Sequence, residues 1–418
     1  MKKRDPSCAD DFDHASLTCE EALSTILDQI DTVAGSEWLA VRSAPGRVLS
    51  ETIISPVDVP QQTNSAMDGY AVRADDLSET GESSFKVIGS SFAGKPFGKG
   101  IGAGEAVRIM TGGAMPEGSD TVIMQEHADV ADDVMTADSN HMRGQNVRAA
   151  GEDLERGQVV LEAGHRLAPA DLGLIASLGI GEVPVFRKVR VAFFSTGDEL
   201  RSIGEPLGPG EIYDSNRYTL FAMLQRIDAE IIDMGVVRDT REAVEAALDQ
   251  AATVADAVIT SGGVSVGEAD YVKEVLNAIG EVSFWKVAMK PGRPLAFGTI
   301  GNAHFFGLPG NPVSVMVTFY QFVQPALFKM AGNRQHTPLL CSARTTAVLK
   351  KRPGRTEYQR GILSRGENGE LLVSPTGDQG SGILRSMSVA DCFIILPVES
   401  GRVEPDTVVS VQPFHGLM

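Results

Sequence analysis

Apolar residues early in the chain recur every three or four positions, a spacing typical of an amphipathic helix. The positions concerned are Ala22, Leu23, Ile26, Leu27 and Ile30. Thr18 lies just before them, where its hydroxyl can cap the first turn. We therefore expect a helix whose first turn holds Glu20 and Glu21, preceded by a polar lead-in over residues 1–16.

The pattern changes between about residues 56 and 148, where short β-favouring runs alternate with glycine-rich turns. Such runs occupy residues 86–88, 105–109 and 120–124. Short strands separated by turn residues predict a small β-rich domain. The last ~80 residues return to the same pattern and predict a compact β-barrel or sandwich.

Residues 188 to about 332 alternate between apolar strands and amphipathic helices. Strands are expected at 189–194, 230–237 and 257–260. One helix is expected after a cap at Asp214 or Ser215, and another, capped by Thr240, from Arg241 to about Thr253. This alternation favours a parallel sheet with helices on both of its faces.

The longest apolar run covers residues 313–330 and is interrupted by Gln321, Gln324, Pro325 and Lys329. A membrane span needs about 20 mostly apolar residues, so this run predicts a helix buried in a core or at a subunit interface. Asn311 is placed to cap that helix, with Pro312 in its first position.

Composition excludes several classes of protein. The formal net charge of −18 disfavours binding to nucleic acid and to anionic membranes. The four cysteines form no CxxC pair, and the seven histidines show no HxH or HxxxH spacing. Neither a disulfide framework nor a thiolate or histidine metal site is therefore predicted, and a reducing cytoplasm is the simplest setting.

Three loops follow predicted strands, at residues 195–199, 261–270 and 307–312. Ligands of open α/β sheets bind beyond the carboxyl ends of the strands, which is where these loops lie. In the second loop, three glycines and two serines can point backbone N–H and hydroxyl donors at an anion such as a phosphate. The alternative reading is an ordinary glycine-rich turn, since the loop matches no standard nucleotide motif.

Charged residues cluster near the same predicted strand ends. Asp198, Glu199, Asp239 and Asp270 are candidate Mg²⁺ ligands, because Mg²⁺ combines one or two carboxylates with ligand phosphates. The alternative is that they are helix caps or solvated charges, and Asp239 has the position most typical of a helix cap.

Lys286, Lys290 and Arg293 precede or occupy a Pro-Gly turn. Even spacing would put both lysines on one strand face, either as an oxyanion site or as a solvated face.

Several modest motifs occur together in a fixed order. They lie at residues 65–70, 151–153, 195–200, 261–271, 290–292, 307–314 and 376–382. In this order they resemble the molybdopterin molybdenumtransferase (MoeA) family, which is related to the gephyrin E domain. The match covers about residues 17–413. Two departures are the run Gln61-Gln62-Thr63 before the first motif and the lack of the proline that usually follows the Thr-Gly pair, here Thr111-Gly112.

The resemblance implies an α/β plus β fold in an elongated, multidomain subunit. Residues 17–55 and 147–187 would form a discontinuous linker and dimerisation domain, with a β-rich domain inserted at 56–146. Residues 188–333 would form a parallel α/β domain that resembles the molybdopterin-adenylyltransferase fold and binds adenylyl-molybdopterin. Residues 338–418 would form a C-terminal β-barrel. In the implied homodimer, the inserted domain of one subunit faces the cleft of the other.

The resemblance also implies which residues act. Catalytic roles would fall to Asp68, Thr111, Glu199, Asp239 and Asp270, and Mg²⁺ would be held by Asp198, Glu199 and Asp239. Molybdate would contact Lys286, Lys290, Arg360 and Ser381. Adenylyl-molybdopterin would contact Asp153, Thr196, Gly197, Ser261, Gly262, Gly263, Ser265, Gly267, Asp270, Pro309 and Pro312.

The implied reaction inserts molybdenum from molybdate into the dithiolene of adenylyl-molybdopterin, with Mg²⁺-dependent release of AMP. The dithiolene sulfurs ligate the molybdenum, so the protein needs no cysteine at the site. The expected partners are a second copy of the chain, the molybdopterin adenylyltransferase and molybdoenzyme-loading proteins, in the cytoplasm. Two alternatives stay open: a molybdopterin adenylyltransferase, which would not need the flanking domains, and a non-catalytic scaffold, which would not need the charged residues.

Overall fold

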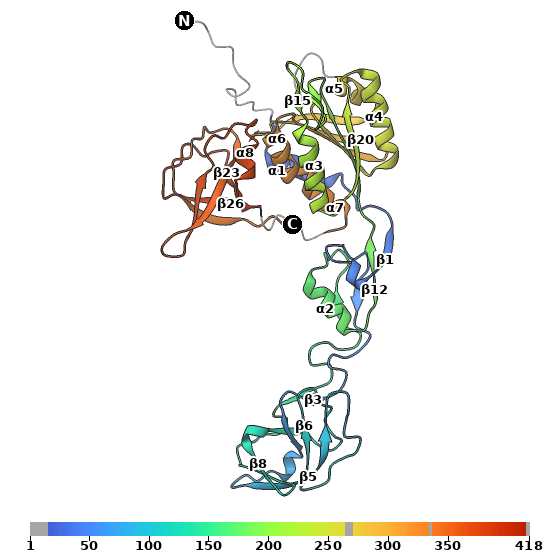
Figure 1. Cartoon of the computed structure of the whole chain (residues 1–418), viewed down its shortest axis with the longest axis vertical. Helices are drawn as coiled ribbons and strands as arrows, with labels where there is room; N and C mark the ends of the chain where they lie inside the picture. The colour runs from blue at the N-terminus through green and yellow to red at the C-terminus, as the bar shows by residue number, and fades with distance from the viewer. Residues whose placement is uncertain (1–15, 264–270, 334–336, 415–418) are drawn as a thin grey trace.

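The computed structural model describes residues 16–263, 271–333 and 337–414, and the predicted site residues Ser265, Gly267 and Asp270 lie outside these ranges. The chain is elongated (Figure 1). An α/β domain and a β-barrel lie together at one end, a narrow linker domain follows, and an inserted β-rich domain forms the far end.

A six-stranded sheet forms the α/β domain, in the order β16-β13-β17-β21-β20-β18. The strands are β13 (Arg190–Thr196), β16 (Glu230–Val237), β17 (Ala257–Ser261), β18 (Glu281–Lys286), β20 (Pro294–Ile300) and β21 (Ala303–Leu308). The first four strands in the sheet are parallel, as predicted, whereas β20 runs antiparallel to both of its neighbours, β21 and β18. The reason is the two-residue turn at Gly301 and Asn302, which can only return the chain antiparallel to itself.

Helices cover both faces of this sheet. Residues of α3 (Ser215–Arg226) and α6 (Pro312–Thr318) belong to the core on one face, and residues of α4 (Arg241–Val254) and α5 (Tyr271–Ile279) to the core on the other. Strand side chains alternate between the two cores, so that Phe193 and Phe194 are buried on opposite faces. Asp214 caps α3 by accepting from the Arg217 backbone N–H, and Thr240 caps α4.

The long apolar run is buried in a helix, as predicted. It consists of α6, the π-helical segment η4 (Phe319–Val323) and α7 (Gln324–Met330) in succession. Helix α1 (Cys19–Asp28) packs against η4 and α7, and Thr18 caps it through a capping box with Glu21. Helix α1 therefore belongs to the α/β core, although the expected linker domain begins at residue 17. Within the described ranges, no helix is long and apolar enough to cross a membrane.

The C-terminal domain is a closed barrel of five strands. These are β22 (Cys341–Thr345), β23 (Thr356–Arg365), β24 (Leu371–Pro375), β25 (Cys392–Leu396) and β26 (Val408–Pro413), with a short helix α8 (Arg385–Ser388). Pairing of β23 with β25 closes the barrel. The short strand β19 (Met289–Lys290) lies between β18 and β20 in the sequence but pairs in parallel with β23 of the barrel. The barrel is therefore joined to the α/β domain beside Lys290.

The barrel and the α/β domain also share one apolar core. Tyr320 of η4 lies 6.0 Å, ring centroid to ring centroid, from Phe393 of β25 and 6.1 Å from Phe414. Tyr358 and Met387 of the C-terminal domain are buried in the same cluster as Phe193 and the helix α6. The two domains are therefore packed as a single unit rather than loosely linked.

Two separated segments build the linker domain. Its elements are β1 (Ser36–Ala40) paired with β12 (Glu182–Phe186), β2 (Ile53–Ile54) paired with β11 (Val159–Leu161), the turn η1 (Val41–Ser43) and helix α2 (Pro169–Ser177). Leu49, Ile175 and Val183 lie in its small core. The domain therefore depends on contacts between residues far apart in the sequence.

The inserted domain is a six-stranded sheet in the order β7-β4-β6-β5-β9-β8. Its elements are β4 (Gly69–Val72), η2 (Ala74–Asp76), β5 (Ser83–Ser91), β6 (Glu105–Ile109), β7 (Thr121–Met124), η3 (Gln125–His127), β8 (Ala128–Ala131) and β9 (Val134–Ala137). The chain enters and leaves it side by side, because β3 (Asn64–Ser65) pairs with β10 (Val147–Arg148).

Candidate active site

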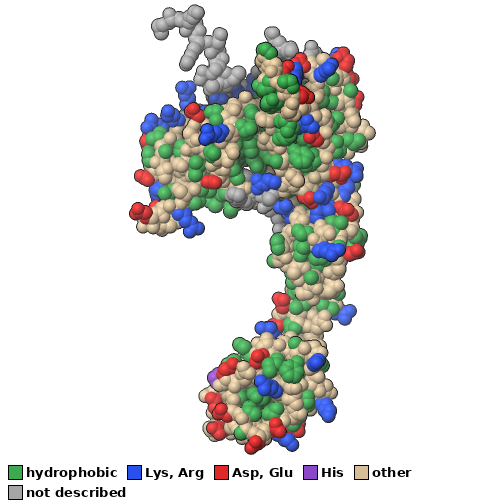
Figure 2. Space-filling model, viewed as in Figure 1, with side chains coloured by type: hydrophobic (Ala, Val, Ile, Leu, Met, Phe, Trp, Pro, Cys, Tyr) green, Lys and Arg blue, Asp and Glu red, His purple; other side chains and the backbone are tan. Residues whose placement is uncertain are grey.

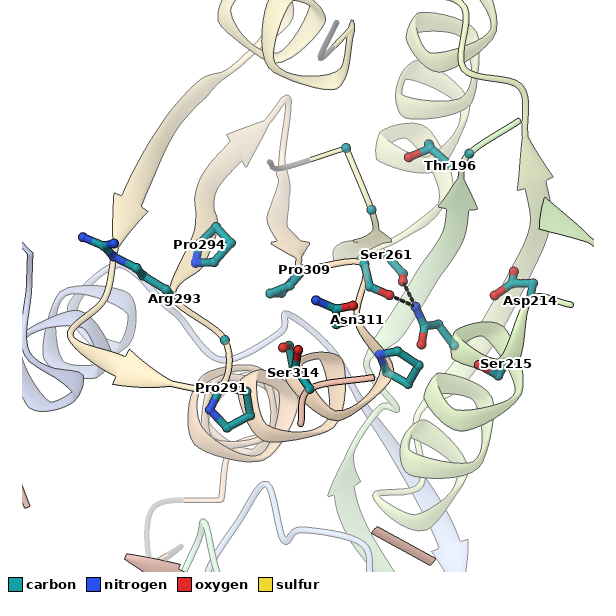
Figure 3. A pocket seen from close by; sticks show the side chains of 18 of the residues that line it. Thr196, Asp214, Ser215, Ser261, Pro291, Arg293, Pro294, Pro309, Asn311 and Ser314 are labelled. Atoms are coloured by element: carbon teal, nitrogen blue, oxygen red, sulfur yellow. Dashed lines mark hydrogen bonds between the residues drawn. The ribbon is translucent and has the colours of Figure 1, made fainter. Parts of the chain in front are cut away.

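A cavity of about 800 Å³ opens between the carboxyl ends of the α/β strands and the barrel. Residues from the ends of β13, β17 and β21 line it on one side, and Arg355, Gln379 and Ser381 of the C-terminal domain line it on the other. Figure 3 shows Thr196, Ser261 and Asn311 around this common space, each on a different element. Ligand binding beyond the strand ends is what the sequence predicts for a sheet of this kind.

Most of the residues predicted to bind substrate line this cavity. They are Thr196, Gly197, Ser261, Gly262, Gly263, Pro309 and Pro312, together with Glu199, Asp239, Lys290 and Ser381. The short strands β14 (Leu200–Arg201) and β15 (Ile212–Tyr213) pair beside it, and Leu200, Ile212 and Tyr213 add apolar surface to its wall. The cavity therefore combines polar, apolar and charged walls.

Gly262 and Gly263 let the backbone after β17 run close to neighbouring atoms. Gly262 has φ +94°, and a Cβ there would lie 2.7 Å from the Thr196 carbonyl oxygen. Gly263 has φ +68°, and its Cβ would lie 2.4 Å from Cγ2 of Val272. Both positions therefore exclude any side chain, and the backbone itself forms the floor of the cavity.

Asn216, in the first turn of α3, joins two of the cavity loops. Its Nδ2 donates to Oγ of Ser261 at 2.8 Å and to the carbonyl oxygen of Gly310 at 2.7 Å, as the dashed lines in Figure 3 show. Asn216 was not among the site residues predicted from the sequence, although its place just after the cap Asp214 was a usable signal. Its amide fixes the spacing between the loops after β17 and β21.

We expect Asn216→Ala to raise the KM for a substrate bound in this cavity roughly ten- to a hundredfold, since it removes hydrogen bonds of about 1–3 kcal/mol in all. The fold should persist, because α3 keeps its cap and its buried face. Steady-state kinetics with varied substrate tests this. A matched control is Gln225→Ala, an exposed residue near the other end of α3, which should leave the KM unchanged.

The barrel side of the cavity is cationic. Lys290, Arg293 and Arg355 line it, and Ser381 adds a hydroxyl. Arg355 was not identified from the sequence. Asn311 also lines the cavity, and it occupies the predicted cap position without making a side-chain cap bond. The donors needed to bind a tetrahedral oxyanion are therefore present at this end.

Two of the predicted molybdate residues lie elsewhere. Lys286 is exposed at the end of β18 and is not part of the cavity wall, because β18 stops there and Lys290 belongs to the separate strand β19. Arg360 is 1% exposed and lies beneath the cavity. Its Nε donates to Oγ of Ser386 and its Nη2 to the carbonyl oxygen of Gly380, while burial lowers its pKa to about 10. Arg360 therefore holds the segment next to Ser381.

The opposite end of the cavity is acidic. Glu199 and Asp239 line it, and Asp198 lies nearby, with its Oδ1 accepting from the Asp239 backbone N–H at 3.4 Å. Asp239 is not the helix cap, because Thr240 fills that position. Partial burial raises the pKa of Asp239, and the negative charges of Asp198 and Glu199 raise it further. This crowding of negative charge is what a bound cation would relieve.

Buried Asp214 also lines the acidic end. One of its carboxylate oxygens caps α3, and the other has no hydrogen-bond partner among the described residues. In the part of the chain that the structure describes, no group of three or more His, Cys, Asp or Glu side chains is arranged to hold a metal ion by itself. A cation here would need further ligands from substrate or water.

Comparison with known proteins identifies the family. Profiles of the MoeA N-terminal region (domains I and II), a probable molybdopterin binding domain and the MoeA C-terminal region (domain IV) match residues 17–179, 192–329 and 342–414. A molybdopterin molybdenumtransferase of Haemophilus influenzae is 46% identical over 404 residues, which is 96% of this chain and 100% of that protein. The chain belongs to the molybdopterin molybdenumtransferase family.

Other relatives support the same family assignment. The Bacillus subtilis protein of that name is 35% identical over 88% of each chain. A gephyrin of Dictyostelium discoideum is 32% identical over 93% of this chain and 61% of its own length. A crystal structure of a Pyrococcus horikoshii molybdopterin biosynthesis MoeA protein superposes with a TM-score of 0.84, at 30% identity, covering 96% of this chain and 100% of that one. The expected fold class is confirmed.

The predicted site residues of the inserted domain lie at the other end of this molybdenumtransferase chain (Figure 1). Asp68 accepts hydrogen bonds from the Thr111 backbone N–H at 2.7 Å and from its hydroxyl at 2.8 Å. These two bonds lower the pKa of Asp68, so the exposed carboxylate stays ionised. Asp153 is exposed near the neck of the inserted domain, and its backbone N–H donates to the Val59 carbonyl. None of the three lines the cavity of its own chain.

Proposed function

We propose that this molybdenumtransferase inserts molybdenum from molybdate into the dithiolene of adenylyl-molybdopterin, with Mg²⁺-dependent release of AMP. The observation that carries the proposal is the polarity of the cavity. A glycine-lined floor suited to phosphates lies between an acidic end, with Glu199 and Asp239, and a cationic end, with Lys290 and Ser381. The proposed setting is a cytoplasmic homodimer.

Each wall has a separate task in this proposal. The backbone N–H of Gly263 and the Ser261 hydroxyl would bind the phosphates of the adenylyl group. The Gly262 N–H donates to the Leu308 carbonyl oxygen at 3.1 Å and so holds the loop against β21. Lys290 and Ser381 would hold molybdate, a substrate dianion, within reach of the dithiolene. Bringing the two substrates together removes the entropic cost of their encounter from the reaction step. Water attacks the phosphoanhydride, AMP leaves, and molybdopterin keeps its own phosphate.

Mg²⁺ fits the acidic end as a cofactor shared with the substrate. Glu199, Asp239 and Asp198 would supply one or two carboxylates, and phosphate oxygens and water would complete the shell. When bound, the ion would neutralise negative charge on the departing AMP. Asp239 and its neighbours would position the adenylyl phosphate through that ion.

Two alternatives fit the cavity less well. A molybdopterin adenylyltransferase would not need the barrel, yet Arg355, Gln379 and Ser381 of the barrel domain complete the cavity wall. A scaffold would not need a charged cavity, yet acidic and basic side chains face each other across this one. Both observations favour an enzyme that brings an oxyanion to a nucleotide-linked substrate.

The direct test is AMP release from adenylyl-molybdopterin by the purified chain, with Mg²⁺ and molybdate. AMP formation and a molybdenum-containing product should both require molybdate and Mg²⁺. The absence of any molybdate-dependent AMP release by the wild-type protein would refute the proposal.

Substitution of lysines tests the cationic end. Lys290→Ala should raise the molybdate concentration for half-maximal AMP release by about ten- to a hundredfold, the loss expected for a charged hydrogen bond of about 1.5–3 kcal/mol. The matched control is Lys286→Ala, which removes the same charge outside the cavity. It should change the molybdate concentration for half-maximal AMP release less than about twofold. Equal effects of the two changes would contradict the assignment.

The acidic end predicts a pH-dependent effect of Mg²⁺ on stability. A carboxyl whose pKa is raised in the folded protein favours the folded state below that pKa, and this contribution is lost as the pH rises through it. A cation replaces the lost proton, so Mg²⁺ with AMP should raise the unfolding midpoint more at about pH 7 than at about pH 4. Differential scanning fluorimetry measures this shift.

Asp239→Asn should abolish most of that Mg²⁺-dependent shift, while Asp249→Asn, an exposed change on α4, should preserve it. A shift that stays the same in Asp239→Asn, or that is independent of pH in the wild type, would remove Asp239 from the cation site. This readout needs no catalytic turnover.

A further inference from the structure

A buried carboxylate lies directly behind the cationic end of the cavity. Glu357 of β23 is in register with Lys290 of β19, and its Oε1 lies 3.4 Å from the Lys290 Nζ. The Glu357 side chain is 8% exposed, whereas the Lys290 side chain is 50% exposed. Glu357 is not itself part of the cavity wall, so the ion pair joins a cavity residue to one behind it.

The second oxygen of Glu357 is held by the barrel. Gln359 donates from its Nε2 to Glu357 Oε2 at 3.0 Å and to the Lys350 carbonyl at 3.0 Å. The carboxylate is therefore fixed on one side and faces Lys290 on the other. A buried carboxylate needs such partners, because an unpaired one would be strongly disfavoured.

A second buried lysine adds to this arrangement. Lys351 is 8% exposed, and its Nζ donates to the carbonyl oxygens of Ser400 at 2.9 Å and of Val398 at 3.4 Å. Burial lowers the pKa of Lys351, while Glu357 and Glu399 raise it. The group thus contains two lysines and one buried carboxylate.

We infer that Glu357 is a positioning residue that acts through Lys290 as its internal counterion and thereby sets the affinity for molybdate. This inference rests on the proposed function. With the site empty, Glu357 holds the Lys290 ammonium in place and offsets its charge. A bound oxyanion shares the Lys290 ammonium with Glu357. The negative charge of Glu357 repels that oxyanion and so weakens its binding.

The sign of the effect distinguishes this role from simple support of the fold. Loss of a structural contact would weaken molybdate binding. Loss of the negative charge, with the shape and the acceptor oxygen kept, should strengthen it. For charges several ångströms apart in a partly solvated site, the expected gain is about tenfold in affinity.

The test measures binding of sodium molybdate to the full-length protein by isothermal titration calorimetry. Glu357→Gln keeps an acceptor for Lys290 and should bind molybdate about tenfold more tightly than the wild type. The matched control is Glu399→Gln, which removes the same charge from an exposed residue near Lys351 and should change the affinity less than about twofold. Unchanged or weaker binding by Glu357→Gln, in a variant with wild-type unfolding midpoint, would overturn the inference.

Two further measurements keep the outcome clear. Perrhenate is tetrahedral like molybdate but carries one negative charge, so Glu357→Gln should improve its binding less. An equal gain for both anions would also overturn the inference. If Glu357→Gln unfolds, Glu357→Asp serves instead, since it keeps the charge but withdraws it by one methylene from Lys290. It should tighten molybdate binding by a smaller factor, and weaker binding would count against the inference.

The same titrations separate this inference from the proposed function. If the wild type does not bind molybdate, or if Lys290→Ala binds it equally well, the proposed anion site itself is wrong. If the wild type binds molybdate through Lys290 and Glu357→Gln has no effect, only the role of Glu357 is wrong. AMP affinity, measured in parallel, should be the same in all variants.

Discussion

An equimolar mixture of Asp68→Ala chains and Lys290→Ala chains should recover about a quarter of the wild-type rate of AMP release, because half of the dimers are mixed and each mixed dimer has one intact site of two. At a molybdate concentration far below the one that Lys290→Ala needs for half-maximal AMP release, each variant alone should be nearly inactive. Asp68 directly precedes β4 of the inserted domain, and that domain lies at the opposite end of the chain from the α/β domain and the barrel (Figure 1). If Asp68 takes part in the reaction, as proposed, it would therefore act at the cavity of a second chain. The proposed homodimer would then place one wall of each site on the other subunit.

Denaturing and refolding the two variants together at equal concentration gives the mixed population. The matched control combines Asp239→Ala with Lys290→Ala, two residues that line the same cavity. Every cavity in that mixture carries one of the two changes, so no activity should return. Failure of the Asp68 mixture to exceed this control would show that Asp68 does not complete the site of a partner subunit.

Gly262→Ala should reduce AMP release at least about a hundredfold, the loss expected when reacting groups are displaced by about 1 Å. A methyl group at residue 262 would lie 2.7 Å from the Thr196 carbonyl oxygen, and φ there is +94°. The backbone must therefore shift, which breaks the bond from the Gly262 N–H to the Leu308 carbonyl and moves the Gly263 N–H away from the position in which it can bind a phosphate. The cost in stability should be of the order of 1–3 kcal/mol.

Steady-state kinetics and chemical denaturation of Gly262→Ala together measure both effects. The matched control is Gly173→Ala in helix α2, where an added Cβ meets no atom within 4 Å. That change should leave activity intact and should slightly stabilise the helix. A nearly fully active Gly262→Ala would show that the loop after β17 does not bind the substrate phosphates through its backbone.

Local patterns in the sequence were enough to predict most single elements. Strand β16 and helix α4 begin where the hydrophobic pattern places them, and the caps at Thr18 and Thr240 are present. These features depend on residues within a few positions of each other. The placement of α1 against the α/β core could not be predicted in this way, since it depends on contacts with η4 and α7 near residue 320.

The cationic end of the site shows where sequence spacing is insufficient. Lys286 and Lys290 have the spacing of one strand face, yet the chain breaks between them and only Lys290 joins the barrel. Arg360 has the right chemistry, but five of the six residues from 356 to 361 are buried, and its guanidinium is buried with them. Arg355 and Asn216 contact the cavity through tertiary folding that no local motif records.

The common core of the α/β domain and the barrel limits how substrates can enter. Phe393 is 0% exposed and Tyr320 is 7% exposed, and prising the two walls apart would expose such rings at a cost of about 1.5–3 kcal/mol for each. We therefore expect the distance between the α/β domain and the barrel to stay the same when substrates bind and dissociate. In the proposed homodimer, adjustment of the site to a bulky pterin would fall instead to the thin double-stranded neck at β3 and β10, where the inserted domain joins the rest of the chain.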